Sequence, residues 1–114
     1  MISKKDQKKI NELMEATALL GDGKEAARFF RDLLTEKELI EFGNRWMAAR
    51  MLWKKESYVD IAKVTGLSST TIARVSKWLT AGEGGYRTII EKLSQANHHH
   101  SLPVSRKGLR LNSR

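Results

Sequence analysis

Residues 57–79 read SYVDIAKVTGLSSTTIARVSKWL, and this stretch decides the expected fold. Ser57 and Ser68 can each cap a helix, because a serine hydroxyl accepts a backbone N–H of the first helical turn. Gly66 lies between the two segments, where a tight turn needs a residue that tolerates positive φ. Ala62 is small enough to stand where the two helices cross. This spacing predicts a helix-turn-helix, with helices over residues 58–64 and 69–79 or 69–80.

The side chains of this stretch also follow the pattern of a motif that reads DNA. Apolar residues stand where the two helices touch inside the bend, although Thr65 is half polar where an aliphatic residue is usual. The second helix begins with small hydroxyl side chains, which let its backbone approach a major groove. Arg74 can hold a guanine edge with two hydrogen bonds, and Lys77 can hold a phosphate. The inner apolar residues are Ile61, Leu67, Ile72 and Val75; the candidates for base contacts are Ser69, Thr70, Thr71 and Arg74, and those for phosphate contacts are Lys63, Ser68 and Lys77.

The spacing of apolar residues and of capping residues predicts four more helices. Asp22 can cap one of them, and residues 35–38 form a capping box in which Thr35 and Glu38 exchange hydrogen bonds. The first proline is Pro103, so no proline interrupts a helix before it. No segment shows the alternation of a β-strand, so the expected fold class is all-α with six helices. The additional helices are expected over residues 4–20, 23–34, 36–54 and 86–94.

The longest predicted helix, residues 36–54, has apolar residues on more than one face. A helix with so wide an apolar surface must be covered on more than one side, and in a short chain a second subunit is a natural cover. The aromatic side chains fall on helical spacing among aliphatic residues, so we expect them in the core rather than on a base-stacking platform. They are Phe29, Phe30, Phe42, Trp46 and Trp53.

The charge balance favours a polyanionic partner. The chain of 114 residues has 21 Lys and Arg against 13 Asp and Glu, a net charge of +8, and basic proteins often bind nucleic acid. No apolar run approaches the ~20 residues of a membrane span, and the N-terminus does not read as a secretory signal. The absence of cysteine fits a reducing cytoplasm. We therefore expect a cytoplasmic protein that binds double-stranded DNA and no membrane.

No catalytic constellation stands out, so the sequence predicts neither an enzyme nor a cofactor. The chain has no cysteine nucleophile and no histidine outside its C-terminal segment. His98, His99 and His100 are adjacent in a polar segment and cannot easily wrap one metal ion, so no metal site is expected. We divide the chain into a helical domain, residues 1–95, and a basic flexible tail, residues 96–114. The tail either touches phosphates at low salt or serves as a solubilising end.

Three motifs together resemble the Trp repressor superfamily: LLTEKEL at residues 33–39, Gly43-x-Arg45, and GxxxTTIAR at residues 66–74. The size and helix order are similar to those of the short, stand-alone Trp-repressor-related proteins of the YerC/YecD type, and the resemblance covers residues 26–93. It implies an intertwined all-α homodimer that binds DNA and represses transcription. A two-fold dimer with one recognition helix per subunit predicts a pseudo-palindromic operator with half-sites ~34 Å apart.

The resemblance also implies a pocket for a small-molecule effector. In the Trp repressors proper, tryptophan is held by residues that match Thr35, Arg45 and Arg74. Two positions depart from that pattern, because Val75 stands in the place of a glycine and Trp78 in the place of a serine. Overfilling packed space typically costs ~1–3 kcal/mol, so we expect that L-tryptophan is not the corepressor. Either Trp78 places its own indole near the pocket and holds the recognition helix without a ligand, or it belongs to the core or to a dimer interface.

The sequence thus predicts a sequence-specific DNA-binding transcriptional regulator that uses the helix-turn-helix at residues 58–79. Repression is what the resemblance implies. Two other functions stay open, a helical module that binds a protein and a non-specific nucleic-acid binder driven by positive charge. The salt dependence and the sequence dependence of binding distinguish the three.

Overall fold

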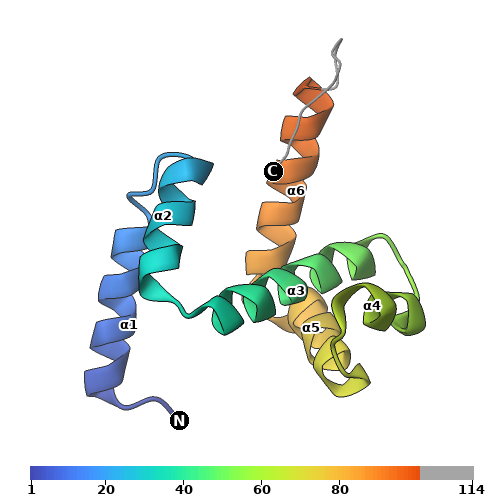
Figure 1. The fold of residues 1–114 in the computed structure, drawn as a ribbon, viewed down its shortest axis with the longest axis horizontal. Helices are drawn as coiled ribbons and strands as arrows, with labels where there is room; N and C mark the ends of the chain where they lie inside the picture. Colours follow the sequence, from blue (N-terminus) through green and yellow to red (C-terminus); the bar gives the residue numbers. More distant parts are fainter. Residues whose placement is uncertain (101–114) are drawn as a thin grey trace. The chain divides into compact units, whose positions relative to one another are not determined.

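A computed structural model describes the backbone of residues 1–100 and the side chains of residues 1–97. Every regular element in this range is an α-helix, which confirms the all-α, six-helix expectation (Figure 1). None of the described helices is long and apolar enough to cross a membrane. The helices are α1 (Lys4–Thr17), α2 (Gly23–Leu33), α3 (Glu36–Trp53), α4 (Tyr58–Thr65), α5 (Ser69–Ala81) and α6 (Gly85–His100).

Side-chain caps fix where several helices begin. In each case a hydroxyl or carboxylate oxygen accepts a backbone N–H of the first turn, which would otherwise have no partner within the helix. The caps predicted for α2, α4 and α5 are confirmed, and α1 has a cap at Ser3 that the sequence pattern had not singled out. The distances from the capping oxygen to the backbone nitrogen are 3.0 Å at Ser3, 2.8 Å at Asp22, 3.1 Å at Ser57 and 3.2 Å at Ser68.

Two helices end elsewhere than expected. α1 stops at Thr17 rather than near Leu20. α6 continues to His100, past the predicted end near Ser94, because no glycine or proline interrupts the chain there before Pro103. The division into a domain and a tail stays a prediction. The basic residues of that tail, Arg106, Lys107, Arg110 and Arg114, and the side chains of His98, His99 and His100 lie outside the described residues.

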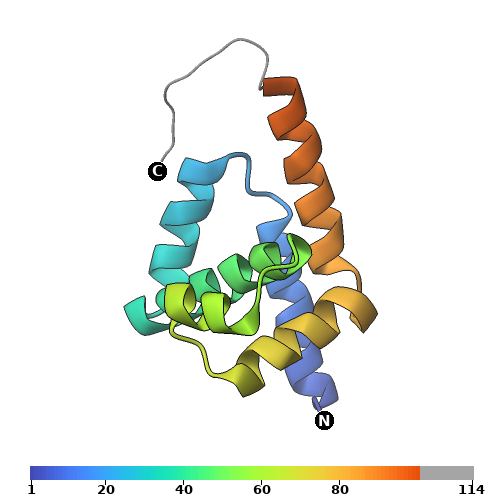
Figure 2. The same ribbon diagram turned by 90° about the vertical axis from the view of Figure 1, so that its right-hand side faces the viewer.

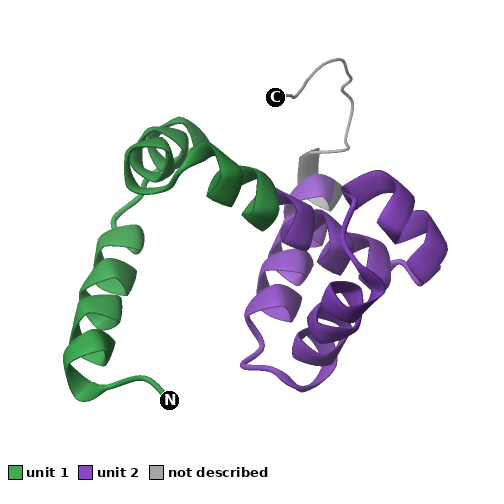
Figure 3. Cartoon of the chain, turned by 60° about the horizontal axis from the view of Figure 1, so that its bottom comes forward, with its two compact units in different colours: residues 1–42 green, residues 43–114 purple. Residues whose placement is uncertain are grey.

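The chain divides into two units, residues 1–42 and residues 43 onward, and the division falls inside α3 (Figure 3). Unit 1 holds α1, α2 and the beginning of α3, and none of its side chains is buried within the chain. Phe42 is 48% exposed, and Trp53 of unit 2 is 40% exposed. The prediction that these two aromatic side chains lie in the core is therefore wrong for the described chain. Both belong to α3, which carries apolar residues on more faces than its own chain covers.

Unit 2 contains the hydrophobic core, to which α3, α4, α5 and α6 all contribute. Ala48 and Ala49 of α3 are fully buried, and their small side chains leave room for larger ones. Ile61 of α4 and both Ile72 and Val75 of α5 are fully buried in the same cluster. α4 and α5 pack against each other, and α5 leads into α6 (Figures 1 and 2). The inner apolar residues of the predicted helix-turn-helix thus form the centre of the core.

The turn between α4 and α5 depends on two neighbouring residues. Gly66 has a φ of 73°, a left-handed conformation that glycine adopts at little cost. Thr65 is buried, and its hydroxyl donates to the Ile61 carbonyl oxygen (2.8 Å) and accepts the Leu67 N–H (3.2 Å). The hydroxyl therefore links the end of α4 to the residue beyond the glycine. This double role explains a threonine where an aliphatic residue is usual.

We expect the Thr65→Val variant to lose about 1–2 kcal/mol in the free energy of unfolding, because the partly buried Leu67 N–H loses its acceptor. Urea unfolding measures that loss. Hydrogen exchange at the Leu67 amide identifies its cause, since exchange should be faster in Thr65→Val and close to the original rate in Thr65→Ser, which keeps the hydroxyl. Unchanged protection of the Leu67 amide in Thr65→Val would show that this hydrogen bond does not hold the turn.

Candidate nucleic-acid interface

α5 has one face in the core and another that faces away from it. Ile72, Val75 and Leu79 are buried. A helix has about 3.6 residues per turn, so the positions between these three point in other directions. The exposed positions on that side combine small, hydroxyl and cationic side chains that suit contact with DNA. They are Ser69, Thr70, Ala73, Arg74 and Lys77.

The hydroxyl groups at the start of α5 are not equivalent. Ser68 caps the helix, and its hydroxyl also donates to the Thr71 hydroxyl oxygen (3.1 Å). Thr71 is half-buried, whereas Ser69 and Thr70 are exposed. Of the predicted base-reading hydroxyls, those of Ser69 and Thr70 are thus the more accessible. The structure places Ser68 and Thr71 together at the helix start, where their hydroxyls hold the cap.

Ala73 also belongs to this exposed face, although it was not among the residues that the sequence pattern predicted to contact DNA. It lies between the hydroxyl residues of the first turn and Lys77. The spacing in the sequence could have indicated Ala73, because positions three and four residues apart share a helix face. The small side chain of an alanine would allow the helix to approach DNA closely, and its methyl group can contact the methyl group of a thymine.

The predicted cations of the motif are exposed. Arg74 and Lys77 project from α5, and Lys63 lies in the last turn of α4. In the part of the chain that the structure describes, none of these three makes an ion pair. Their positive charge is therefore not neutralised by a described carboxylate, and it can act on an approaching phosphate.

Thr35, the first of the predicted effector residues, belongs to unit 1 and begins α3. Its hydroxyl accepts the Glu38 N–H (3.1 Å), and its own N–H donates to the Glu38 carboxylate (2.9 Å). This arrangement confirms the predicted capping box. The hydrogen bonds from the backbone and from the side chain of Thr35 favour the ionised carboxylate, so they hold the pKa of Glu38 below its ordinary value. The hydroxyl and the backbone N–H of Thr35 therefore both stabilise the N-terminus of α3.

Arg45, the second predicted effector residue, is half-buried on α3 in unit 2. Its positive charge acts on Tyr86 of α6: burial raises the pKa of the Tyr86 hydroxyl, and Arg45 opposes that rise. Trp46 stacks on Tyr86, with ring centroids 6.3 Å apart and an interplanar angle of 21°. Arg45 is therefore positioned where α3 meets the first turn of α6.

The two positions that depart from the tryptophan-binding pattern have opposite surroundings. Val75 is fully buried in the core of unit 2. Trp78 is 45% exposed, so its indole is not part of that core. The alternative that Trp78 is a core residue of the single chain is therefore wrong. Its role beside an effector pocket and its role in a dimer interface both stay predictions.

Known proteins with a similar sequence or structure bear on this geometry. A family model described as Trp repressor protein matches residues 8–94. An uncharacterized protein of Bacillus subtilis, YerC, is 33% identical over 94 residues, which cover 82% of this chain and 90% of that protein. Among solved structures, a TrpR-like protein from Eubacterium eligens is 37% identical with a TM-score of 0.71, over 76% of this chain and 90% of that one.

A candidate Trp repressor from Staphylococcus aureus is 30% identical with a TM-score of 0.69, over 75% of this chain and 85% of that one. The matched residues 8–94 include every described helix from α2 to α5 and make up most of the chain. Sequence and structure therefore agree on the same relationship, which the helix-turn-helix and the capping box had already indicated. The chain belongs to the Trp repressor family.

Proposed function

We propose that this protein is a sequence-specific transcriptional regulator that inserts α5 into the major groove of DNA. The observation that carries the proposal is the exposed face of α5, which is polar and cationic while the other side of the same helix is buried in the core. Membership of the Trp repressor family, a family of DNA-binding regulators, supports it. The protein would act as a repressor in the cytoplasm, where bacterial DNA lies.

Individual residues receive roles from their place on this face. Ser69, Thr70, Ala73 and Arg74 would contact bases, because they line the accessible part of the recognition helix. Thr71 is a base contact only through its methyl group or after its hydroxyl leaves the cap. The residues that would hold phosphates are Lys63, Ser68 and Lys77.

A homodimer is the second part of the proposal. Large apolar side chains are exposed on unit 1 and along α3, among them Leu33, Ile40, Phe42 and Met47. Apolar surface of this extent, left uncovered by its own chain, is typical of an interface. A second copy of the chain would cover it and would present two recognition helices to half-sites ~34 Å apart.

A pull-down of sheared genomic DNA at near-physiological salt, followed by sequencing, tests the function as a whole. A few sharp peaks that share a two-fold motif are expected from a sequence-specific dimer. Flat, salt-sensitive retention would instead identify a non-specific binder driven by the net charge of +8. No retention at all would point either to a missing effector or to a helical module whose partner is a protein, and ligand and partner screens would distinguish the two.

The Arg74→Ala and Lys77→Ala variants should weaken DNA binding in different ways. We expect Arg74→Ala to weaken operator binding by about 1–3 kcal/mol and to relax the preference at one base pair, because a guanine contact is lost. Lys77→Ala should weaken binding to every sequence alike and lower the salt slope by about one. Fluorescence anisotropy with operator and scrambled duplexes over a salt series measures both effects.

Lys92→Ala, which removes an exposed cation from α6, serves as the control for lost charge. A loss in Arg74→Ala that is the same for operator and scrambled DNA would demote Arg74 to a phosphate contact.

We also propose that L-tryptophan is not the corepressor. Val75 fills packed space where the tryptophan-binding relatives have glycine, and Trp78 adds bulk where they have serine. Isothermal titration calorimetry with L-tryptophan should give no micromolar binding, and L-tryptophan should leave DNA affinity unchanged. Micromolar binding that disappears in Arg45→Ala and Arg74→Ala would refute this proposal.

A further inference from the structure

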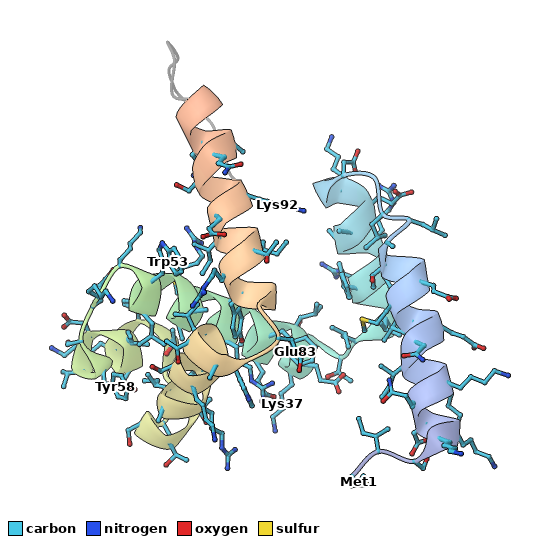
Figure 4. The ribbon with its side chains drawn as sticks, turned by 180° about the vertical axis from the view of Figure 1, so that it is seen from behind. Met1, Lys37, Trp53, Tyr58, Glu83 and Lys92 are labelled. Carbon is cyan, nitrogen blue, oxygen red and sulfur yellow. The ribbon has the colours of Figure 1, made fainter. Side chains whose placement is uncertain are left out.

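Trp53 lies at the C-terminal end of α3 (Figure 4). The surface around it is hollowed on two sides. The larger hollow has a volume of about 410 Å³ and lies between the end of α3, the C-terminal half of α5 and the start of α6. This volume falls within the range of ~300–1,000 Å³ of small-molecule sites. We call it the Trp53 hollow. The smaller one, about 170 Å³, lies on the side of Trp53 toward Ile90 and Leu93 of α6.

The Trp53 hollow has an apolar side. Leu79 contributes from the core, Leu52 is half-buried, and the indole of Trp53 is 40% exposed. An exposed indole beside aliphatic side chains is suited to stack on a planar ring. Such stacking is stabilised by the apolar area that it buries and by the favourable geometry of two offset rings. Ser76 adds a half-buried hydroxyl to the same wall. A ligand that fits here therefore has an apolar or aromatic body.

The charged side of the hollow is mainly positive. Lys55 and Arg87 line it together with a single carboxylate, that of Glu56. On the other side of Trp53, Arg50 and Lys54 line the smaller hollow, which has no acidic residue. Within the described residues none of these four cations makes an ion pair. The excess of unpaired positive charge selects an anion.

The backbone at Lys55 gives an independent reason to assign a role to this cation. Lys55 has a φ of 67°, and it is the only non-glycine residue with positive φ in the described chain. Its N–H donates to the Leu52 carbonyl oxygen (2.9 Å), and the Glu56 N–H donates to the Met51 carbonyl oxygen (3.0 Å). This hydrogen-bond pattern ends many helices, usually with glycine at the left-handed position. A lysine there places an ammonium group at the hollow where backbone preference alone favours glycine.

We propose that the Trp53 hollow binds a small organic anion with an aromatic or apolar ring. The ring would stack on Trp53 above Leu52 and Leu79, and the anionic group would lie between Lys55 and Arg87. None of the predicted effector residues Thr35, Arg45, Arg74, Val75 and Trp78 lines this hollow. Binding would join the ends of α3 and α5 to α6, and it does not depend on the proposed binding of DNA.

The test uses 1-naphthyl phosphate as a probe, with the full chain and without DNA. Calorimetry should give a dissociation constant on the order of 0.5 mM, which corresponds to the usual binding free energy per non-hydrogen atom for a ligand of this size. 1-Naphthol, which lacks the charge, and inorganic phosphate, which lacks the ring, should each bind at least about tenfold more weakly. In ¹H–¹⁵N spectra, the largest shifts should fall on Lys55, Ser76, Thr80 and Arg87.

Three variants probe the charged side. Arg87→Gln and Lys55→Gly should each weaken probe binding about tenfold, as expected for the loss of one charge-assisted hydrogen bond. Glu56→Gln should strengthen it, because a repelling carboxylate is removed. Lys55→Gly should also raise the thermal unfolding midpoint, since glycine relaxes the left-handed backbone, so weaker binding by this variant cannot be due to unfolding. Lys92→Gln is the matched control, because it removes an exposed cation from α6 that does not line the hollow.

Several results would overturn the proposal. They are the absence of binding, affinity for 1-naphthol or for inorganic phosphate equal to that for the probe, and affinity unchanged by both Arg87→Gln and Lys55→Gly. Spectral shifts centred on Arg45 and Arg74 would place the ligand in a different site. Each of these outcomes leaves the proposed DNA binding unaffected, because that function is measured separately with operator DNA.

Discussion

The burial of one face of α5 in the core that it shares with the alanines of α3 sets the geometry on which the candidate site depends. Ile72 and Val75 are fully buried in the same cluster as Ala48 and Ala49, and each side chain of this size contributes ~1.5–3 kcal/mol when buried. Any rotation of α5 about its own axis would lift them out of the core. The outward direction of Arg74 and its neighbours on the exposed face thus follows from core packing, and the proposed DNA-binding surface needs no stabilising contacts of its own.

Local hydrogen bonds at the end of α4 and the start of α5 complete this constraint. Gly66 allows the chain to turn, the Thr65 hydroxyl bridges the turn, and Ser68 caps the start of α5. Each of these bonds is local in sequence, so the angle between the two helices is determined largely within residues 57–72. The core then orients this preformed corner on α3.

Local signals explain which features the sequence alone could predict. Caps such as Ser57, Ser68 and the Thr35–Glu38 box act within one helical turn, so the sequence alone could predict them. The apolar periodicity of α5 likewise predicts which of its faces is buried. The exposure of Phe42 and Trp53 was not predictable, because it depends on which faces of α3 other helices happen to cover. The Trp53 hollow brings together residues from α3, α5 and α6, and the left-handed backbone of Lys55 has no composition signal. Tertiary arrangement alone reveals them.

Residues 1–42 bury no side chain within their own chain, although α1 and α2 are well-capped helices. Helices of this length are marginal in water without packing, so association in the proposed homodimer would supply much of the free energy that orders them. Association obeys mass action, and stability coupled to it rises with protein concentration. In the proposed homodimer the amount of folded, DNA-competent protein would then vary with nearly the square of the total at low abundance. A cell could set the regulator's output through its copy number alone, and sparse molecules, loose at the N-terminal helices, would be the first that proteases remove.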